Sequence, residues 1–172
     1  YISPQIWAWR RGRGKRIAKL IDHMAVILPF EEHLYEELDV PVTFVGHPLL
    51  DDDLPAVEHA LKEGVQAPAV IGLVPGSREN EIIKLLPIML DAAQILKQNL
   101  NHVKFIISRA PSVEKSLIEG IVGRCRPVSG EVEIISDKVD TVFEQSDVIM
   151  AASGTVTLQA AIHGTPMAIT YK

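Results

Sequence analysis

Seven short apolar runs recur along the chain, separated by polar or helix-patterned stretches. The runs are continuous rather than alternating, which is typical of strands that are covered on both faces. They occupy residues 25–30, 42–46, 69–74, 103–108, 132–136, 147–152 and 166–171. Helical spacing is found at 31–38, 79–99, 112–122, 138–145 and 155–163, and a further helix starts at Lys15 with apolar positions as far as Met24. This alternation predicts an α/β fold, with a Rossmann-like parallel sheet and helices on both of its faces.

A polar, proline-containing stretch at residues 49–55 interrupts the alternation and indicates a hinge. We therefore predict two domains, with residues 1–50 forming the end of one domain plus the hinge and residues 51–172 forming a ligand-binding domain. A length of 172 residues suits one full domain, or one domain plus part of another. The chain opens on Tyr1 and stops at the end of an apolar run, so both ends are expected to continue in a longer protein.

The amino-acid composition indicates a protein with a substantial core and argues against several other classes of protein. Hydrophobic residues make up 47% of the chain, which is enough for a substantial core, and a net charge of −5 argues against a nucleic-acid binder. One cysteine, Cys125, cannot form an internal disulfide, which fits a reducing cytoplasm. No apolar stretch approaches the roughly 20 residues that a membrane-spanning helix needs.

The opening segment differs in charge from the rest of the chain. Its first 21 residues hold six basic residues and no acid, together with Trp7 and Trp9. Tryptophan beside arginine and lysine is typical of a contact with a membrane surface or an anionic ligand. A solvated helix face beside two core tryptophans explains the same pattern.

The turn Pro75-Gly76-Ser77-Arg78 follows the apolar run 69–74 and precedes a predicted helix. Gly76 lets the backbone approach a ligand closely, and Ser77 can cap the helix, whose free N–H groups favour an anion. Arg78 adds a fork-shaped cation suited to phosphate, and Glu81 can pair with it and orient it. An ordinary strand–helix turn with a solvated arginine is the alternative.

A second loop of this kind connects the run 147–152 to the helix 155–163. Ser153, Gly154 and Thr155 keep the helix N-terminus open, so that hydroxyl and N–H groups can bind a diphosphate. Gln159 shares the face of Thr155 and can reach a ribose hydroxyl. A plain N-cap would need the same residue types. Two such loops after different strands of one sheet nevertheless favour a nucleotide site at the carboxyl ends of the strands.

Other kinds of site fit the spacing less well. No lysine follows Gly76 as a Walker A loop requires, and no G-x-G-x-x-G fingerprint occurs. The acidic run at 51–53 is more typical of a solvated turn than of a metal site, and the histidines lack metal-ligand spacing. His47 is either a turn residue or faces a cleft. Ser153 lacks the G-x-S-x-G context of a nucleophile.

The segments "SPQIWAWRRGR", "ILPFE", "FVGHPL", "LVPGSRENEI" and "ASGTVTLQAAIHGTPM", in this order, resemble the lipid-A-disaccharide synthase family. These are inverting glycosyltransferases of the GT-B fold. The resemblance implies that 51–172 is the UDP-sugar-binding half and 1–50 the end of the acceptor-side domain. It implies a UDP-2,3-diacylglucosamine donor, a 2,3-diacylglucosamine 1-phosphate acceptor, and the β-1,6-linked lipid A disaccharide plus UDP as products. It also implies action at the cytoplasmic face of the bacterial inner membrane, with no metal or cofactor.

The resemblance assigns roles to the loop residues. Gly76, Ser77 and Arg78 match one part of the family's nucleotide site, with Arg78 the candidate catalytic residue, and the matches in the second loop are Ser153, Gly154 and Thr155. The family often has glutamate where this chain has Gln159, so the strength of ribose binding is open but its location is not. The family's general base is expected upstream of Tyr1, and these residues alone are therefore expected to be inactive.

Three alternatives stay open at this point. The chain could belong to another GT-B enzyme of UDP-N-acetylglucosamine, either a 2-epimerase or the peptidoglycan glycosyltransferase. It could instead be a non-catalytic nucleotide-binding module. The sequence leaves the oligomeric state and the acyl-chain specificity undetermined.

Overall fold

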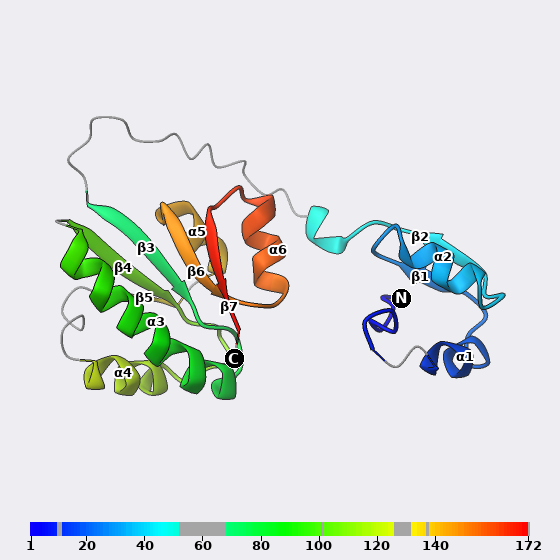
Figure 1. Ribbon diagram of the computed structural model, residues 1–172, viewed down its shortest axis with the longest axis horizontal. Helices are drawn as coiled ribbons and strands as arrows, with labels where there is room; N and C mark the ends of the chain where they lie inside the picture. The colour runs from blue at the N-terminus through cyan, green and yellow to red at the C-terminus, as the bar shows by residue number, and fades with distance from the viewer. Residues whose placement is uncertain (10–11, 52–67, 101, 126–131, 137, 172) are drawn as a thin grey trace. The chain divides into compact units, whose positions relative to one another are not determined.

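The computed structural model describes residues 1–9, 12–51, 68–100, 102–125, 132–136 and 138–171 (Figure 1). The chain divides into two compact units, Tyr1–Leu54 and Pro55–Lys172. Most of the predicted hinge at 49–55, and two of the three aspartates at 51–53, lie outside the described residues. The assignment of each unit to a domain of a larger enzyme remains a prediction.

The first unit is a small α/β element. Two short parallel strands, β1 (Met24–Val26) and β2 (Val42–Phe44), flank helix α2 (Glu31–Glu36) in sequence. Helix α1 (Arg13–Ala18) precedes them, and a 3-10 turn, η1 (Pro48–Leu50), follows. The core of this unit is built by Ile6, Met24, Val26, Tyr35 and Val40. Inside it the hydroxyls of Ser3 and Tyr35 share a buried hydrogen bond of 2.8 Å, which ties the opening segment to α2.

One helix prediction in this unit is wrong in its length. The helical spacing runs from Lys15 to Met24, but α1 ends at Ala18 and the side chain of Leu20 is 74% exposed. Met24 instead begins β1, because its amide donates to the carbonyl of Pro41 at 2.8 Å and the residue pairs with Val42. Pairing with a distant strand therefore overrides the local period.

The second unit is a five-stranded parallel sheet in the order β5-β4-β3-β6-β7. The strands are β3 (Ala69–Val74), β4 (Val103–Ser108), β5 (Val132–Ile135), β6 (Val148–Ala152) and β7 (Met167–Thr170). From β3 the chain moves outward through β4 to β5, then returns to the other side of β3 for β6 and β7. The direction of winding therefore reverses between β3 and β6, which is the kind of place where ligands bind in open α/β sheets.

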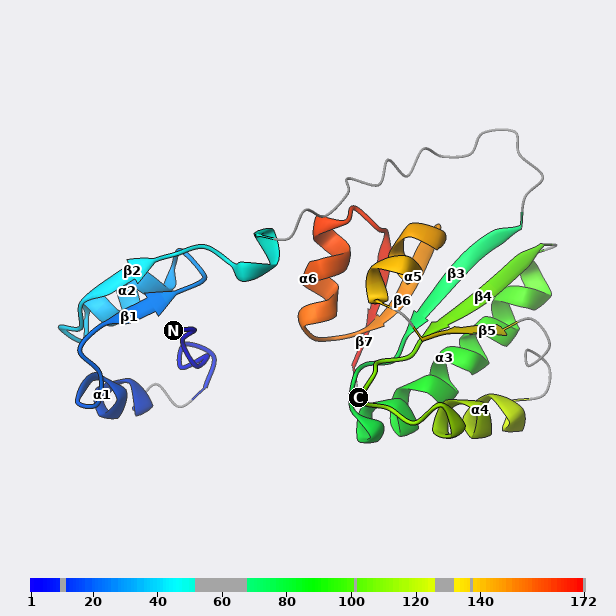
Figure 2. The same cartoon turned by 180° about the vertical axis from the view of Figure 1, so that it is seen from behind.

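Helices cover both faces of this sheet, as the continuous apolar strands predict (Figures 1 and 2). Helices α3 (Glu79–Asn99) and α4 (Lys115–Arg124) pack on one face, over a core that includes Leu73, Leu86 and Phe105. Helices α5 (Val139–Gln145) and α6 (Thr155–Ile162) pack on the other, over Val74, Phe143 and Ile149. The predicted fold class is confirmed.

One helix of the second unit starts later than predicted. Helix α4 begins at Lys115 rather than at Ser112, because the amide of Val113 turns back to the carbonyl of Ala110 at 3.0 Å. Helix α3 runs unbroken through Pro87, and buried residues on either side of the proline, such as Leu86 and Met89, hold both halves against the sheet. Gly164, with φ of 74°, follows α6 in the left-handed conformation that often ends a helix.

Candidate functional site

A cavity of about 600 Å³ lies at the carboxyl ends of strands in the second unit. That volume falls within the range of small-molecule sites, roughly 300–1,000 Å³. Residues that follow β3, β4, β5 and β6 all contribute to its lining, so it extends across the ends of four neighbouring strands. All the residues predicted for a nucleotide site line this one cavity: Gly76, Ser77, Arg78, Glu81, Ser153, Gly154, Thr155 and Gln159.

The loop after β3 depends on Gly76, whose φ is +109°. Backbone in this region is strained for residues that carry a Cβ. The space at this position is also restricted, since a Cβ would lie 2.5 Å from Oε2 of Glu81. The positive φ is therefore the reason for glycine here, whereas a Cβ would also displace the flexible Glu81 carboxylate that pairs with Arg78.

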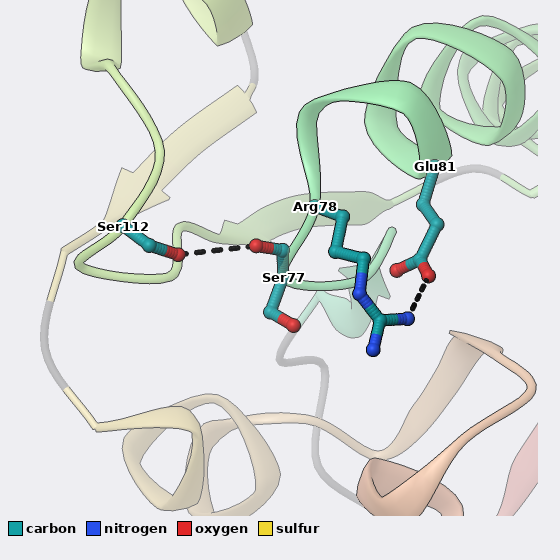
Figure 3. Close-up of polar contacts among 4 residues, drawn as sticks. All are labelled: Ser77, Arg78, Glu81 and Ser112. Atoms are coloured by element: carbon teal, nitrogen blue, oxygen red, sulfur yellow. Dashed lines mark hydrogen bonds and ion pairs between the residues drawn. The ribbon is translucent and has the colours of Figure 1, made fainter.

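Arg78 and Glu81 form the charged pair that the sequence predicts. Nη1 of Arg78 donates to Oε1 of Glu81 at 2.7 Å, as Figure 3 shows. The Arg78 side chain is 79% exposed, so the pair by itself adds little to stability. Its effect is to hold the guanidinium on the cavity side of the loop, with N–H groups left over for a ligand.

The prediction that Ser77 caps helix α3 is wrong. The N-cap residue is Arg78, with no side-chain hydrogen bond, and its backbone carbonyl accepts from the amides of Glu81 and Ile82 at 3.0 and 3.1 Å. The carbonyl of Ser77 accepts from Oγ of Ser112 at 3.1 Å (Figure 3). That bond uses the backbone carbonyl of Ser77, and the residue is one of those that line the cavity.

The loop after β6 supplies the second group of donors. Helix α6 starts at Thr155, and its N-cap, Gly154, makes no side-chain capping bond. The carbonyl of Gly154 accepts from the amide and hydroxyl of Thr157 at 3.1 and 2.7 Å, which closes the first turn. The first N–H groups of a helix have no partner within it, and Thr155 and Val156 both line the cavity. The arrangement suits an anion at this end of α6.

The residues on the other side of the cavity were not predicted from the sequence. Its lining there consists of Ser108, Arg109, Ala110, Pro111, Ser136, Lys138 and Val139. Most of these residues stand directly after the apolar runs 103–108 and 132–136, so the rule that ligands bind beyond the carboxyl ends of strands could have found them. Among the described residues of the lining, Arg78, Arg109 and Lys138 outnumber the single acid, Glu81, so this described part of the cavity is basic in a chain of net charge −5.

His47 and Asp51, which were considered as possible cleft or metal-site residues, both lie at the short turn η1 of the first unit. His47 lies in the first unit, where its Nδ1 accepts from the amide of Leu49 at 3.2 Å and caps η1, so it is a turn histidine. Asp51 is exposed at the end of the same turn. Among the described residues no group of three or more histidine, cysteine, aspartate or glutamate side chains is arranged to hold a metal ion.

Comparison with known proteins points to one family. A family model described as lipid-A-disaccharide synthetase matches residues 1–172. Lipid-A-disaccharide synthase of Geobacter sulfurreducens is 45% identical over 177 residues, covering 100% of this chain and 45% of that protein. The enzymes of Trichlorobacter lovleyi and Coxiella burnetii are 42% and 41% identical, again covering 100% of this chain and 45% of each relative. The chain therefore spans about 45% of the length of these relatives.

Proposed function

The chain belongs to the lipid-A-disaccharide synthetase family, and on this premise we propose that it forms the donor-binding part of a glycosyltransferase. In this proposal the whole enzyme moves 2,3-diacylglucosamine from its UDP donor to 2,3-diacylglucosamine 1-phosphate. The products are the lipid A disaccharide 1-phosphate and UDP. The second unit binds the UDP half of the donor, and the first unit belongs to the acceptor side of a GT-B enzyme.

The observation that carries the proposal is the pair of donor-rich loops after β3 and β6. They follow neighbouring strands on either side of the point where the winding reverses, and both line the same basic cavity. When the bond between the sugar and the diphosphate breaks, negative charge develops on the leaving phosphate. Preorganised N–H groups and the guanidinium of Arg78 stabilise that charge at the moment it forms.

We propose the remaining roles from the family resemblance, and the shared cavity supports them. Gly76, Ser77 and Arg78 contact the diphosphate from one side, and Ser153, Gly154 and Thr155 contact it from the other. Glu81 orients Arg78 through the 2.7 Å ion pair. Gln159 offers its amide to the ribose. A general base must also take the proton of the acceptor hydroxyl. The family resemblance implies that another part of the enzyme supplies it, and we therefore propose that these 172 residues bind the nucleotide without transferring sugar.

The direct test is a calorimetric titration of UDP into this chain, with uridine as the control. We expect UDP to bind more tightly than uridine, because only UDP carries the phosphates that the two loops contact. The same preparation is then given donor and acceptor, and no disaccharide is expected. Equal affinities for UDP and uridine would contradict the phosphate assignment, and disaccharide formation would contradict the division of roles between this chain and the rest of the enzyme.

We also propose that the first unit contacts the membrane surface from which the acylated substrates are drawn. Arg13, Lys15, Arg16 and Lys19 are exposed on and after α1. Trp9 and Leu20 are 72% and 74% exposed. Basic residues near an anionic surface contribute about 1 kcal/mol each, and exposed tryptophan suits the headgroup region. Within the described residues no helix is long and apolar enough to cross a bilayer.

Vesicle sedimentation tests this contact. The chain is expected to sediment with vesicles rich in phosphatidylglycerol and to stay in the supernatant with phosphatidylcholine alone. Charge reversal by Lys15→Glu with Arg16→Glu removes most of the binding. The matched control reverses two exposed lysines of the second unit, Lys84→Glu with Lys104→Glu, and should retain it. Equal losses in the two double variants would assign the effect to net charge rather than to the α1 segment.

A further inference from the structure

The cavity has two sides with different chemistry. The loops that suit a diphosphate follow β3 and β6, whereas the loops after β4 and β5 line the cavity on the β5 side of the sheet. Neighbouring strands lie about 4.8 Å apart, so four strand ends span about 14 Å. A diphosphate held at β3 and β6 therefore leaves room over β4 and β5 for the organic part of a nucleotide.

Arg109 lies at the start of the loop after β4 and ties that loop to β5. Its Nε donates to Oγ of Ser136 at 2.9 Å, across the gap between the two loops. Its Nη1 donates to the carbonyl of Val113 at 2.6 Å, within its own loop. Its backbone amide donates to the carbonyl of Ile135 at 2.9 Å. One residue thus fixes the relative position of two loops that form a wall of the cavity.

The two arginines of the cavity are held in different ways. The Arg78 side chain is 79% exposed and pairs with the carboxylate of Glu81. The described hydrogen bond of its guanidinium uses Nη1 alone. Arg109 commits donors to a serine hydroxyl and a backbone carbonyl, both neutral acceptors. Two of the N–H groups of Arg109 thus brace the loops after β4 and β5.

The bond to Ser136 also orients a polar group of the cavity wall. The Ser136 hydroxyl accepts from Arg109, which leaves its own hydrogen to donate. Ser136 lines the same cavity as Ala110 and Pro111, two residues that offer apolar surface to a planar ring. An apolar surface with a few fixed polar groups is the usual composition of a small-molecule site.

We propose that Arg109 is a positioning residue for the nucleoside half of the ligand, acting through Ser136 and the backbone of the 108–113 loop. It sets the wall that the base and ribose contact and makes no contribution to diphosphate binding. This inference rests on the proposed nucleotide site, and it adds the part of the cavity that determines which nucleoside fits.

Three ligands separate the two halves of the site: UDP, uridine and inorganic pyrophosphate. Uridine and pyrophosphate affinities are read by NMR titration of this chain, which detects millimolar binding. Arg109→Ala is expected to weaken uridine and UDP by about the same factor, roughly tenfold, and to leave pyrophosphate unchanged. Arg109→Lys keeps the charge but loses the fork, and is expected to be as impaired toward uridine as Arg109→Ala.

Three further variants complete the test, and the first of them controls for a general loss of structure. Arg124→Ala removes a similar guanidinium, whose Nε donates to the carbonyl of Gly120 at 3.0 Å on helix α4 away from the cavity, and should leave all three affinities unchanged. Ser136→Ala should weaken uridine, and the double variant Arg109→Ala with Ser136→Ala should be no weaker than Arg109→Ala alone.

The measured affinities distinguish a positioning role of Arg109 from a role as a phosphate ligand. Loss of pyrophosphate affinity in Arg109→Ala, or full recovery in Arg109→Lys, would overturn the positioning role and make Arg109 a phosphate ligand. Unchanged uridine and UDP affinities in Arg109→Ala would overturn this inference alone. If the unsubstituted chain binds none of the three ligands, the nucleotide site itself is overturned, and the inference with it.

Discussion

We expect Arg78→Ala to weaken UDP binding by about 10- to 100-fold and to leave uridine binding unchanged. This is the largest effect on ligand binding that we expect from a single substitution. A hydrogen bond to a charged group contributes roughly 1.5–3 kcal/mol, which corresponds to that range of affinity. Only UDP presents phosphate oxygens to the guanidinium. Calorimetry with both ligands measures the difference, and the Arg124→Ala variant controls for the loss of one surface charge.

Two neighbouring substitutions sharpen this result. Arg78→Lys retains a positive charge without the planar fork, so it should recover part of the lost UDP affinity. Glu81→Gln removes the ionic partner that lies 2.7 Å from Arg78, and a smaller loss is expected because the arginine stays but is held less firmly. If Arg78→Ala weakened uridine and UDP to the same extent, the loop after β3 would not be a phosphate loop.

Gly72→Ala is expected to destabilise the second unit by about 1–3 kcal/mol, the usual range for overpacking a core. Gly72 lies within β3, facing α5. A Cβ there would lie 2.5 Å from Oγ of Ser146, 2.8 Å from Cγ2 of Ile149 and 3.0 Å from Cγ1 of Val142. All three atoms are attached directly to a Cβ, and the Ser146 hydroxyl already donates to the carbonyl of Val142 at 2.6 Å. The strand and α5 must therefore move apart.

Urea unfolding followed by circular dichroism measures this change. The matched control is Gly120→Ala on the exposed face of α4, where a Cβ meets nothing within 4 Å. That substitution should stabilise the helix by about 0.5–1 kcal/mol. Tryptophan fluorescence arises only from Trp7 and Trp9, so it reports the first unit separately. Equal effects of the two alanine substitutions would contradict the close packing of α5 on β3.

Much of the second unit could be predicted from the sequence because its signals are local. Continuous apolar runs such as 69–74 and 103–108 become buried parallel strands with the predicted bounds. Glycine with a hydroxyl and an arginine after a strand predicts a loop with free donors, and Gly76, Ser77 and Arg78 do line the cavity. Prediction failed where a distant contact outweighed a local preference, as when Met24 left a helical pattern to pair with Val42.

Hydrophobic period and turn chemistry act over a few residues, so the strands 69–74 and 103–108 and the two donor-rich loops were predictable from the sequence. Which loops share a cavity depends on the tertiary fold, because the order β5-β4-β3-β6-β7 brings segments 76–78 and 153–155 to neighbouring strand ends. The brace from Arg109 to Ser136 spans 27 residues of sequence and carries no local pattern. Such contacts depend on strand order, which packing of the whole sheet selects.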